Sequence, residues 1–347
     1  MQFKTLAYAL LLLLSTAACT SLYKAKLQEF EKNKQYRFAF YNVENLFDTL
    51  DDPLTRDEEF TPTGKKKWSE ERYQTKLDQI AQVLGDMNYP AVVGFCEVEN
   101  AKVLQDLVQK TKLKDYNYKY VHYDSPDKRG IDNGLIYIDG LFKVTNSDAT
   151  RIDFPKEVVE GYTTRDILHV EGVFRQKDTM HFFVNHWPSR RGGLKASQPK
   201  RVYVATQLRK QTNKILTNNP NAKIVITGDF NDEPDNDSVL SALDAKPVGE
   251  TVENNKLYNC SSKADKEGLG SYRYKGNWNM LDQFIVSGSM INKNSSITLT
   301  DAQIFRPAYL VYVDKKYGDK PSRTYGGPKY YGGYSDHFPV FVDVLVK

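Results

Sequence analysis

The sequence predicts an α/β fold in which two β-sheets pack face to face between flanking helices. Predicted strands and helices alternate loosely from residue 36 to the end of the chain. The predicted strands are too many, and the predicted helices too few, for a single parallel sheet, which favours two packed sheets. No linker-like stretch interrupts residues 36–347, and a chain of 347 residues with 40% hydrophobic content can bury one large core. We therefore predict a single folded domain over residues 36–347.

The individual elements follow from their hydrophobic patterns. Apolar residues at helical spacing predict helices at 75–87, 101–113 and 199–216. Aromatic and β-branched runs predict strands at 36–43, 91–98, 134–138, 167–174, 180–187, 282–287 and 338–344, and a strand with a turn at 222–232. The run AVVGFCEV at 91–98 is apolar almost throughout, which indicates a strand buried on both faces.

Charge and composition set only mild limits on the function. The net charge is +4, from 48 Lys and Arg against 44 Asp and Glu, which permits a polyanionic substrate without requiring one. Tyrosine is frequent, with 23 residues, and either packs in a β-rich core or faces a ligand.

The N-terminus is typical of an exported protein. The apolar run at 6–14 is shorter than the roughly 20 residues that span a bilayer, and it fits the hydrophobic region of a secretory signal. The small residues before Cys19 resemble the lipobox of bacterial lipoproteins. That resemblance implies a signal peptide at 1–18, acylation of Cys19 and a tether at 19–35. Residue 20 is Thr and not the aspartate that signals retention in the inner membrane, so we expect an outer-membrane anchor. The folded domain would then face one side or the other of that membrane. An ordinary cleavage site is the alternative.

Polar residues of similar kinds begin or end six of the predicted strands. They are Asn42, Glu97, His186, Asp229 with Asn231, Asp282, and Asp336 with His337. Each has a simple explanation by itself, since GDFND is a good turn sequence. Strand ends at one sheet edge, however, converge where α/β proteins place their sites. Carboxylate and amide oxygens suit Mg²⁺ or Mn²⁺, and histidines can move protons or bind phosphate, whereas no zinc-type Cys/His cluster occurs.

Seven motifs carry a resemblance to a known family. In order they are YNVENLF, FCEVEN, NGLIY, NHWPSRRGG, TGDFND, LDQFIVS and GYSDHFPV, and together they cover about residues 36–347. This series resembles the endonuclease/exonuclease/phosphatase family, the superfamily of deoxyribonuclease I. The resemblance implies a four-layer α/β/β/α sandwich and hydrolysis of phosphoester bonds with a divalent metal, Mg²⁺ or Mn²⁺.

The resemblance also implies metal and water roles. Glu97 would be the principal metal ligand, with Asn42 and Asp336 assisting. Asp229 and Asn231 would position or deprotonate the attacking water. Which residue is the general base stays open.

The two histidines of the motifs would act on the phosphate. His337 would contact the scissile phosphate, with its ring oriented by Asp282, and His186 would lie near the leaving oxygen as proton donor or phosphate contact. Such groups supply what the transition state of phosphoester attack lacks, because charge builds on its oxygens. We expect the other histidines, His122, His169 and His181, to be structural.

Further substrate contacts are expected in loops. Arg190 and Arg191 follow His186 and are either an anion clamp or solvated charge. Arg129 and Asn133 are similar candidates for substrate contacts.

The expected activity is that of a nuclease. The segments SYRYKGNW and KKYGDKPSRTYGGPKYYGG interleave Tyr with Lys and Arg, a composition that can stack bases and pair phosphates. A phosphatase or phospholipase-like phosphodiesterase of the same fold and an inactive binding lipoprotein are the alternatives. NMLDQFIVS lacks the signature of inositol-polyphosphate phosphatases, and no membrane-inserting apolar hairpin is evident. We expect a nucleic acid substrate, a membrane contact through the lipid anchor only, and no protein partner.

Overall fold

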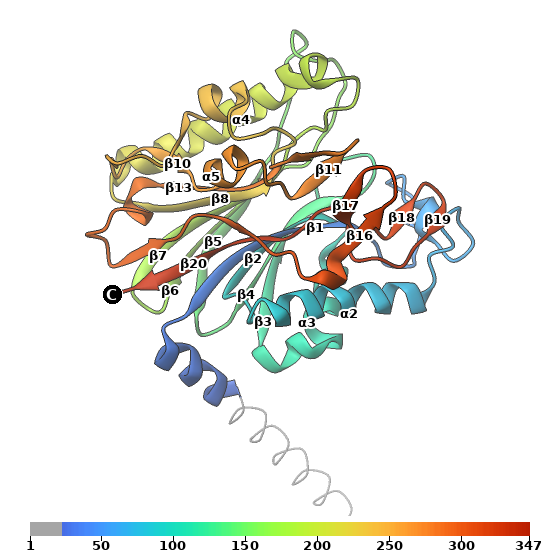
Figure 1. Ribbon diagram of the computed structural model, residues 1–347, viewed down its shortest axis with the longest axis horizontal. Coiled ribbons are helices and arrows are strands. Elements are labelled where there is room, and N and C mark those ends of the chain that lie inside the picture. Colours follow the sequence, from blue (N-terminus) through green and yellow to red (C-terminus); the bar gives the residue numbers. More distant parts are fainter. Residues whose placement is uncertain (1–22) are drawn as a thin grey trace, which may run out of the picture.

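Two large β-sheets pack face to face, and helices cover their outer sides (Figure 1). The structure is a computed structural model and describes residues 23–347. Cys19 and the expected signal peptide lie outside these residues. Within the described part of the chain, no helix is long and apolar enough to cross a membrane. The predicted four-layer α/β/β/α sandwich is confirmed.

The first sheet is built around two parallel strands, β1 (Tyr36–Leu46) and β2 (Val92–Val98). β20 (Val340–Val346) runs antiparallel beside β1, so the first and last strands of the domain are neighbours. β4 (Asp132–Ile138) and β3 (Tyr118–His122) continue the sheet beyond β2, while β14 (Ile297–Leu299) and β15 (Gln303–Ile304) pair with β20. Helices α2 (Glu70–Asp86) and α3 (Ala101–Lys110) cover the outer face, at the bottom of Figure 1.

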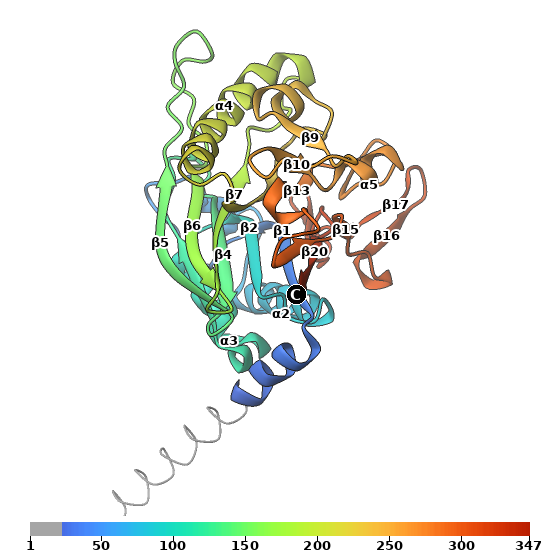
Figure 2. The same cartoon turned by 90° about the vertical axis from the view of Figure 1, so that its left-hand side faces the viewer.

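The second sheet repeats this order of pairings. Its central parallel strands are β7 (Asp178–His186) and β8 (Lys223–Asp229). β13 (Asp282–Ser287) runs antiparallel to β8, followed by β10 (Leu257–Asn259) and β9 (Ala245–Pro247). β6 (Ile167–Phe174) and β5 (Phe142–Thr150) lie on the other side, antiparallel to β7 and to each other. Helix α4 (Leu194–Asn218) covers the outer face of this sheet (Figure 2).

Short elements complete the domain. Three hairpins are formed by β11 (Tyr272–Tyr274) with β12 (Asn277–Asn279), β16 (Val311–Asp314) with β17 (Gly318–Pro321), and β18 (Tyr325–Gly326) with β19 (Lys329–Tyr330). Helix α5 (Ser262–Lys266), a further helix over residues 23–33, and single turns at Glu58–Phe60, Lys112–Tyr116, Ser238–Ala242, Gly288–Met290 and Ala308–Leu310 fill the remaining connections.

The inner faces of the two sheets form one continuous core. Phe182 of the second sheet packs edge to face on Phe38 of the first, with ring centroids 5.0 Å apart. Gly94 on β2 marks a close approach of the sheets, because a Cβ there would lie 3.2 Å from side-chain atoms of Val184 and Thr227. Cys96 and Cys260 are buried free thiols.

Candidate active site

A hydrogen bond between two predicted site residues joins the sheets at one end. Nδ2 of Asn42 on β1 donates to Oδ2 of Asp229, the last residue of β8, at 3.1 Å, and both residues are buried. The sequence places Asn42 at the end of its strand, whereas β1 continues to Leu46. Regular pairing with β2 nevertheless breaks after Asn42, because Glu44 and Asn45 adopt left-handed backbone angles. The break turns this part of the strand toward the second sheet.

Asp282 holds the ring of His337, the contact expected from the sequence. Asp282 begins β13 and stands opposite Asp229 in the ladder between β13 and β8. Its Oδ2 accepts a hydrogen bond from Nδ1 of His337 at 2.6 Å and another from the hydroxyl of Ser271. Burial disfavours a charged imidazole, but the carboxylate of Asp282 and its hydrogen bond hold the pKa of His337 well above its usual range. His337 is therefore an imidazolium at neutral pH.

His186, the last residue of β7, is a neutral imidazole. Burial, together with the charges of Arg165 and Arg129, lowers its pKa well below the usual range. Its Nε2 lies 3.7 Å from Oδ2 of Asp229 and 4.0 Å from Oε1 of Glu97. These distances exceed hydrogen-bond length, so Nε2 of His186 has no direct hydrogen bond to either carboxylate.

Asp229 is the residue on which the other groups converge. Nε2 of His337 lies 3.8 Å from its Oδ2, on the same oxygen that faces His186. Burial raises the pKa of Asp229 to about 6, and the charge of His337 offsets part of that rise. Its Oδ1 accepts from the backbone nitrogen of Asn231 at 2.9 Å, and Nδ2 of Asn231 donates to the carbonyl of Trp187 at 3.0 Å. These bonds fix the left-handed turn at Asn231.

Glu97 and Asp336 provide partly buried carboxylates beside this group, with side chains 14% and 26% exposed. Glu97 lies at the irregularity that ends β2, where its backbone is left-handed, and its Oε2 accepts from the backbone nitrogen of Asn45 at 3.1 Å. Burial raises the pKa of Glu97, and the negative charge of Asp336 adds to the rise. Asp336 contacts Arg323 at 3.4 Å.

This donor set fits a divalent metal. Glu97 and Asp336 are hard oxygen donors whose charges repel each other, and the two arginines nearby, Arg129 and Arg323, are themselves 52% and 40% exposed. Oδ1 of Asn42 accepts from the backbone nitrogen of Glu44 at 3.0 Å, which leaves one lone pair for a metal. One ligand-type atom each from Asp229, Asp282 and His337 also lies within 4.8 Å of the others, but the charged ring of His337 is already bound to Asp282.

The residues predicted to contact the substrate differ in how far they are available to it. All three groups of the Arg190 guanidinium bond to the protein itself, with Nε donating to the carbonyl of Asn231 at 2.7 Å and Nη1 to Oδ1 of Asn279 at 2.8 Å. Arg190 thus supports the Asn231 turn, whereas Arg191 is exposed. Asn133 is buried, and its Nδ2 donates to the carbonyl of Asp166 at 2.8 Å.

Two further residues contact the site: Arg165, which sequence reasoning missed, and Tyr272, which belongs to the segment SYRYKGNW offered for base stacking. Arg165 is buried, and it donates to the carbonyls of His186 and Trp187 at 3.1 and 2.7 Å while pairing with Asp127 at 2.9 Å. The ring of Tyr272 covers the imidazole of His337, with centroids 4.7 Å apart. Nothing in the local sequence of Arg165 marks it, since TTRDI reads as a loop.

Two buried charged residues missed by the sequence reasoning, Glu44 and Lys76, hold the loop that leads to Asp336. The carboxylate of Glu44 accepts from the backbone nitrogens of Thr324 and Tyr325 at 2.6 and 3.2 Å. Nζ of Lys76, on α2, donates to Oγ1 of Thr324 at 2.6 Å and to the carbonyl of Tyr334 at 2.5 Å. Lys76 is 1% exposed, and it falls at helical spacing on the apolar face of α2, which was the available signal.

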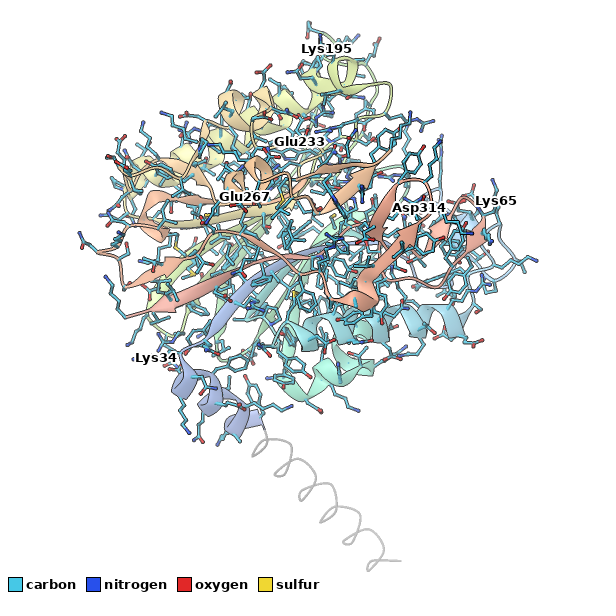
Figure 3. The ribbon with its side chains drawn as sticks, viewed as in Figure 1. Lys34, Lys65, Lys195, Glu233, Glu267 and Asp314 are labelled. Atoms are coloured by element: carbon cyan, nitrogen blue, oxygen red, sulfur yellow. The ribbon has the colours of Figure 1, made fainter. Side chains whose placement is uncertain are left out.

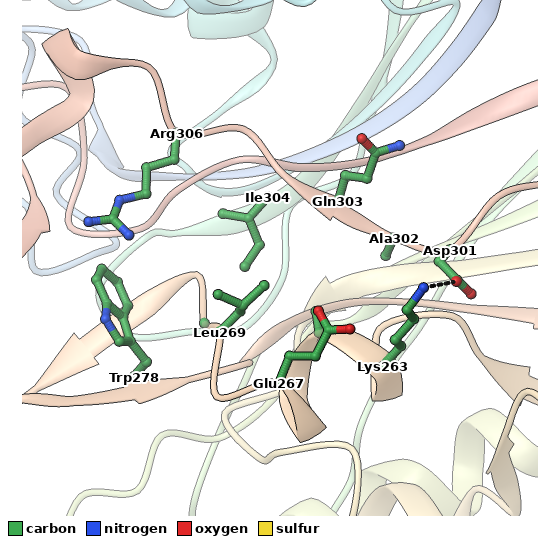
Figure 4. A pocket seen from close by; sticks show the side chains of 11 residues that line it. Lys263, Glu267, Leu269, Trp278, Asp301, Ala302, Gln303, Ile304 and Arg306 are labelled. Atoms are coloured by element: carbon green, nitrogen blue, oxygen red, sulfur yellow. Dashed lines mark ion pairs between the residues drawn. The ribbon is translucent and has the colours of Figure 1, made fainter.

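A separate pocket of about 370 Å³ lies away from these residues (Figure 4). Its wall includes Trp278 with Arg306 over its ring at 4.9 Å, and an ion pair of Lys263 with Asp301 at 3.5 Å. None of the predicted site residues lines it, so the catalytic chemistry is not located there.

Comparisons with known proteins agree with this geometry. A family model described as the endonuclease/exonuclease/phosphatase family matches residues 37–346. A search of curated proteins finds no match.

Several solved structures share the fold at low identity. A structure of D. rerio TDP2 with a single-strand DNA product is 14% identical, with a TM-score of 0.54, and covers 89% of this chain and 98% of that chain. The human nocturnin catalytic domain with bound sulfate is 14% identical, with a TM-score of 0.54 and coverage of 90% and 95%. A mannosyl-6-phosphatase from Bacteroides thetaiotaomicron is 17% identical, with a TM-score of 0.53 and coverage of 89% and 99%.

Proposed function

Because the chain belongs to the endonuclease/exonuclease/phosphatase family, whose members hydrolyse phosphoesters, we propose that it is a divalent-metal-dependent phosphodiesterase that cleaves nucleic acid. The observation that carries the phosphoester chemistry is the imidazolium of His337, fixed by Asp282 and facing Asp229. A fixed positive group next to a buried carboxylate suits a reaction in which water attacks an oxygen-rich, negatively charged phosphorus centre.

The proposed roles of His337, Asp229 and His186 follow from their charges. His337 donates from Nε2 to a non-bridging phosphate oxygen, since Nδ1 is held by Asp282. Asp229, with a pKa of about 6, is ionised at neutral pH and accepts the proton of the attacking water. His186 is neutral, and its buried Nδ1 has no hydrogen-bond partner, so its Nε2 carries the proton and donates to an oxygen of the substrate.

Glu97 and Asp336, assisted by Asn42, would hold Mg²⁺ or Mn²⁺. When bound, such an ion neutralises charge that develops on the phosphate oxygens. The bonds of Glu97 to Asn45 and of Asp336 to Arg323 restrain the orientation of both carboxylates.

The preference for nucleic acid rests on groups around the phosphate position. Tyr272 offers an aromatic ring next to His337, where it can stack a base of the scissile nucleotide. The exposed cation Arg191 lies in the loop before α4 and the exposed cation Lys195 in the first turn of α4, and Figure 3 shows Lys195 at the edge of the molecule. Tyr325 and Tyr330, which the sequence also offers for stacking, pack instead on each other and near Trp68 and Arg72.

A phosphatase of the same fold is the second candidate, because a mannosyl-6-phosphatase is among the structural neighbours. Tyr272 distinguishes the nuclease from the phosphatase, because a small sugar phosphate has no base to stack on its ring.

The test is a direct assay of the purified chain on plasmid DNA, single-stranded DNA, RNA, phospholipid and a sugar phosphate, with Mg²⁺ or Mn²⁺ and with chelator. We expect metal-dependent cleavage of nucleic acid that falls steeply with salt, because phosphate contacts release counterions. Tyr272→Ala should slow nucleic acid cleavage more than hydrolysis of a small phosphodiester, which would lose only the contact of the ring with His337. Intact nucleic acids together with rapid hydrolysis of a lipid or sugar phosphate would exclude the nuclease.

A further inference from the structure

Two histidines meet on the outer face of the second sheet, where β5, β6 and β7 lie side by side (Figure 2). Nε2 of His169 on β6 lies 3.2 Å from Nδ1 of His181 on β7. Two imidazole nitrogens bound to one tetrahedral Zn²⁺ at about 2.0–2.1 Å are about 3.3 Å apart. The observed separation is therefore close to that of a shared metal.

A carboxylate holds the opposite side of His169. Nδ1 of His169 lies 3.0 Å from Oδ2 of Asp148 on β5, so its proton is directed at that carboxylate and the lone pair of Nε2 is left facing His181. The His169 ring also stacks on Phe183, with centroids 4.5 Å apart. A metal-bound histidine usually has such a carboxylate partner on its second nitrogen.

A third ligand lies on the same face of the sheet. Glu171 is two residues after His169 and stands directly opposite His181 in the ladder between β6 and β7. Its Oε2 lies 3.9 Å from Nδ1 of His181, and its side chain is 34% exposed. A change of the Glu171 rotamer would bring its carboxylate to the nitrogens of both histidines.

We propose that His169, His181 and Glu171 form a binding site for Zn²⁺ or a similar transition-metal dication, with Asp148 as the carboxylate that orients His169. Two imidazoles and one carboxylate select such ions over Mg²⁺, which prefers oxygen ligands.

This site is distinct from the catalytic one. His181 and His186 lie five residues apart on β7, about 17 Å at roughly 3.4 Å per residue. An odd spacing places them on opposite faces of the strand, so His186 faces the space between the sheets and His181 the outer face. Occupation by a metal would cross-link β6 and β7 and so stabilise the folded state.

The experiment measures Zn²⁺ binding to the purified chain by equilibrium dialysis in excess Mg²⁺, which occupies the oxygen-rich active site. The wild type should bind one Zn²⁺ more per chain than His169→Ala or His181→Ala. Asp148→Asn, which removes only the orienting carboxylate at a 51% exposed position, should weaken the affinity about 10- to 100-fold. Glu157→Gln, a change at an exposed acidic loop residue, is the matched control and should bind as the wild type does.

Thermal unfolding gives a second readout that is independent of catalysis. Zn²⁺ should raise the melting temperature of the wild type and of Glu97→Gln, but not that of His169→Ala. Glu97→Gln should lose Mg²⁺-dependent hydrolysis and keep the Zn²⁺ site, so failure of the proposed activity would not imitate failure of this site. Equal Zn²⁺ stoichiometry and affinity in the wild type, Asp148→Asn and His181→Ala would show that the two histidines form only a hydrogen-bonded pair, and would overturn the proposal.

Discussion

The hydrogen bond from Nδ1 of His337 to Oδ2 of Asp282, 2.6 Å long, connects the segment entering β20 of the first sheet to the start of β13 in the second. It is buried on both sides, and the hydroxyl of Ser271 donates to the same carboxylate oxygen. The bond therefore fixes both the orientation and the charge of His337.

Asp282→Asn should lower kcat by about 100-fold or more, because the ring loses its charge partner and one preferred orientation. Burial then acts on His337 without the main opposing cause, and its pKa falls. In the wild type the imidazolium persists until the pH passes the raised pKa, so His337 limits activity on the alkaline side, whereas protonation of Asp229 limits it on the acid side. The decline should begin at lower pH in the variant. A kcat profile over pH measures this, with Asp301→Asn as the control. An unshifted alkaline limb would contradict the role of Asp282.

Asp229→Asn should stabilise the protein in chelator while abolishing activity. The pKa of Asp229 is raised to about 6 in the folded state, so the folded protein binds its proton more tightly than the unfolded chain does. Stability due to this group is complete below the usual pKa near 4 and is lost as pH rises through 6. The variant lacks that loss, so its free energy of unfolding should exceed that of the wild type by roughly 1–3 kcal/mol at pH 8. Urea unfolding with chelator at pH 4.5 and pH 8 measures the difference, which should be about three times smaller at the lower pH, where the carboxyl group of the unfolded chain is already mostly ionised.

Replacing Glu44 or Lys76 should lower both the free energy of unfolding and kcat. Burial raises the pKa of Glu44 to about 7 and lowers that of Lys76 to about 8, and the charge of each residue opposes the shift of the other. Glu44→Gln or Lys76→Met alone should cost about 2–4 kcal/mol, since each leaves one buried charge without compensation. The double variant should cost less than the sum of the two.

The measurement is a double-mutant cycle by chemical denaturation, with kcat determined in parallel. Lys65→Met, at the exposed position labelled in Figure 3, is the control. Strict additivity would show that the two residues act independently.

Arg190 and its neighbours in the loop should have separable effects. Arg190→Ala removes donors to the carbonyl of Asn231 and to Asn279, so the turn next to Asp229 loosens and kcat falls. Arg191→Ala with Lys195→Ala removes only exposed charge, so KM should rise and the salt dependence of nucleic acid cleavage should decrease, with kcat at saturation nearly unchanged. Steady-state kinetics at several salt concentrations separates the two. A rise of KM alone in Arg190→Ala would identify it as a phosphate clamp instead.

We also propose that the chain is a lipoprotein acylated at Cys19. Cys19→Ser should release the protein from membranes or block processing of residues 1–18. Membrane fractionation and mass spectrometry of the N-terminal peptide measure both. Unchanged fractionation with an unmodified peptide would exclude the anchor.

Much of the fold and most of the site could be predicted because the relevant signals are local. Continuous apolar runs identified strands such as β2 and β8, and the polar residue that follows each run was visible in the sequence. The strand β5, FKVTNSDAT, was not predicted, because it is a polar edge strand whose pattern resembles a loop. The short hairpins were missed for a similar reason, since each has at most four residues per strand.

Tertiary contacts account for the remaining differences. Arg190 reads as a phosphate clamp in sequence, but the fold surrounds it with acceptors from Asn231, Asn236 and Asn279. His169 and His181 were expected to be only structural, and their meeting depends on the register between β6 and β7. No short-range pattern encodes such a register.

The pairing of β1 with β20 also determines when the residues of the candidate site come together. β20 inserts between β1 and β14, so the first sheet is completed by a strand that is synthesised about 300 residues after its neighbour β1. Asp336 and His337 lie just before that strand, whereas Asn42 lies on β1 and Glu97 on β2. The candidate site is therefore assembled only after β20 has joined the sheet.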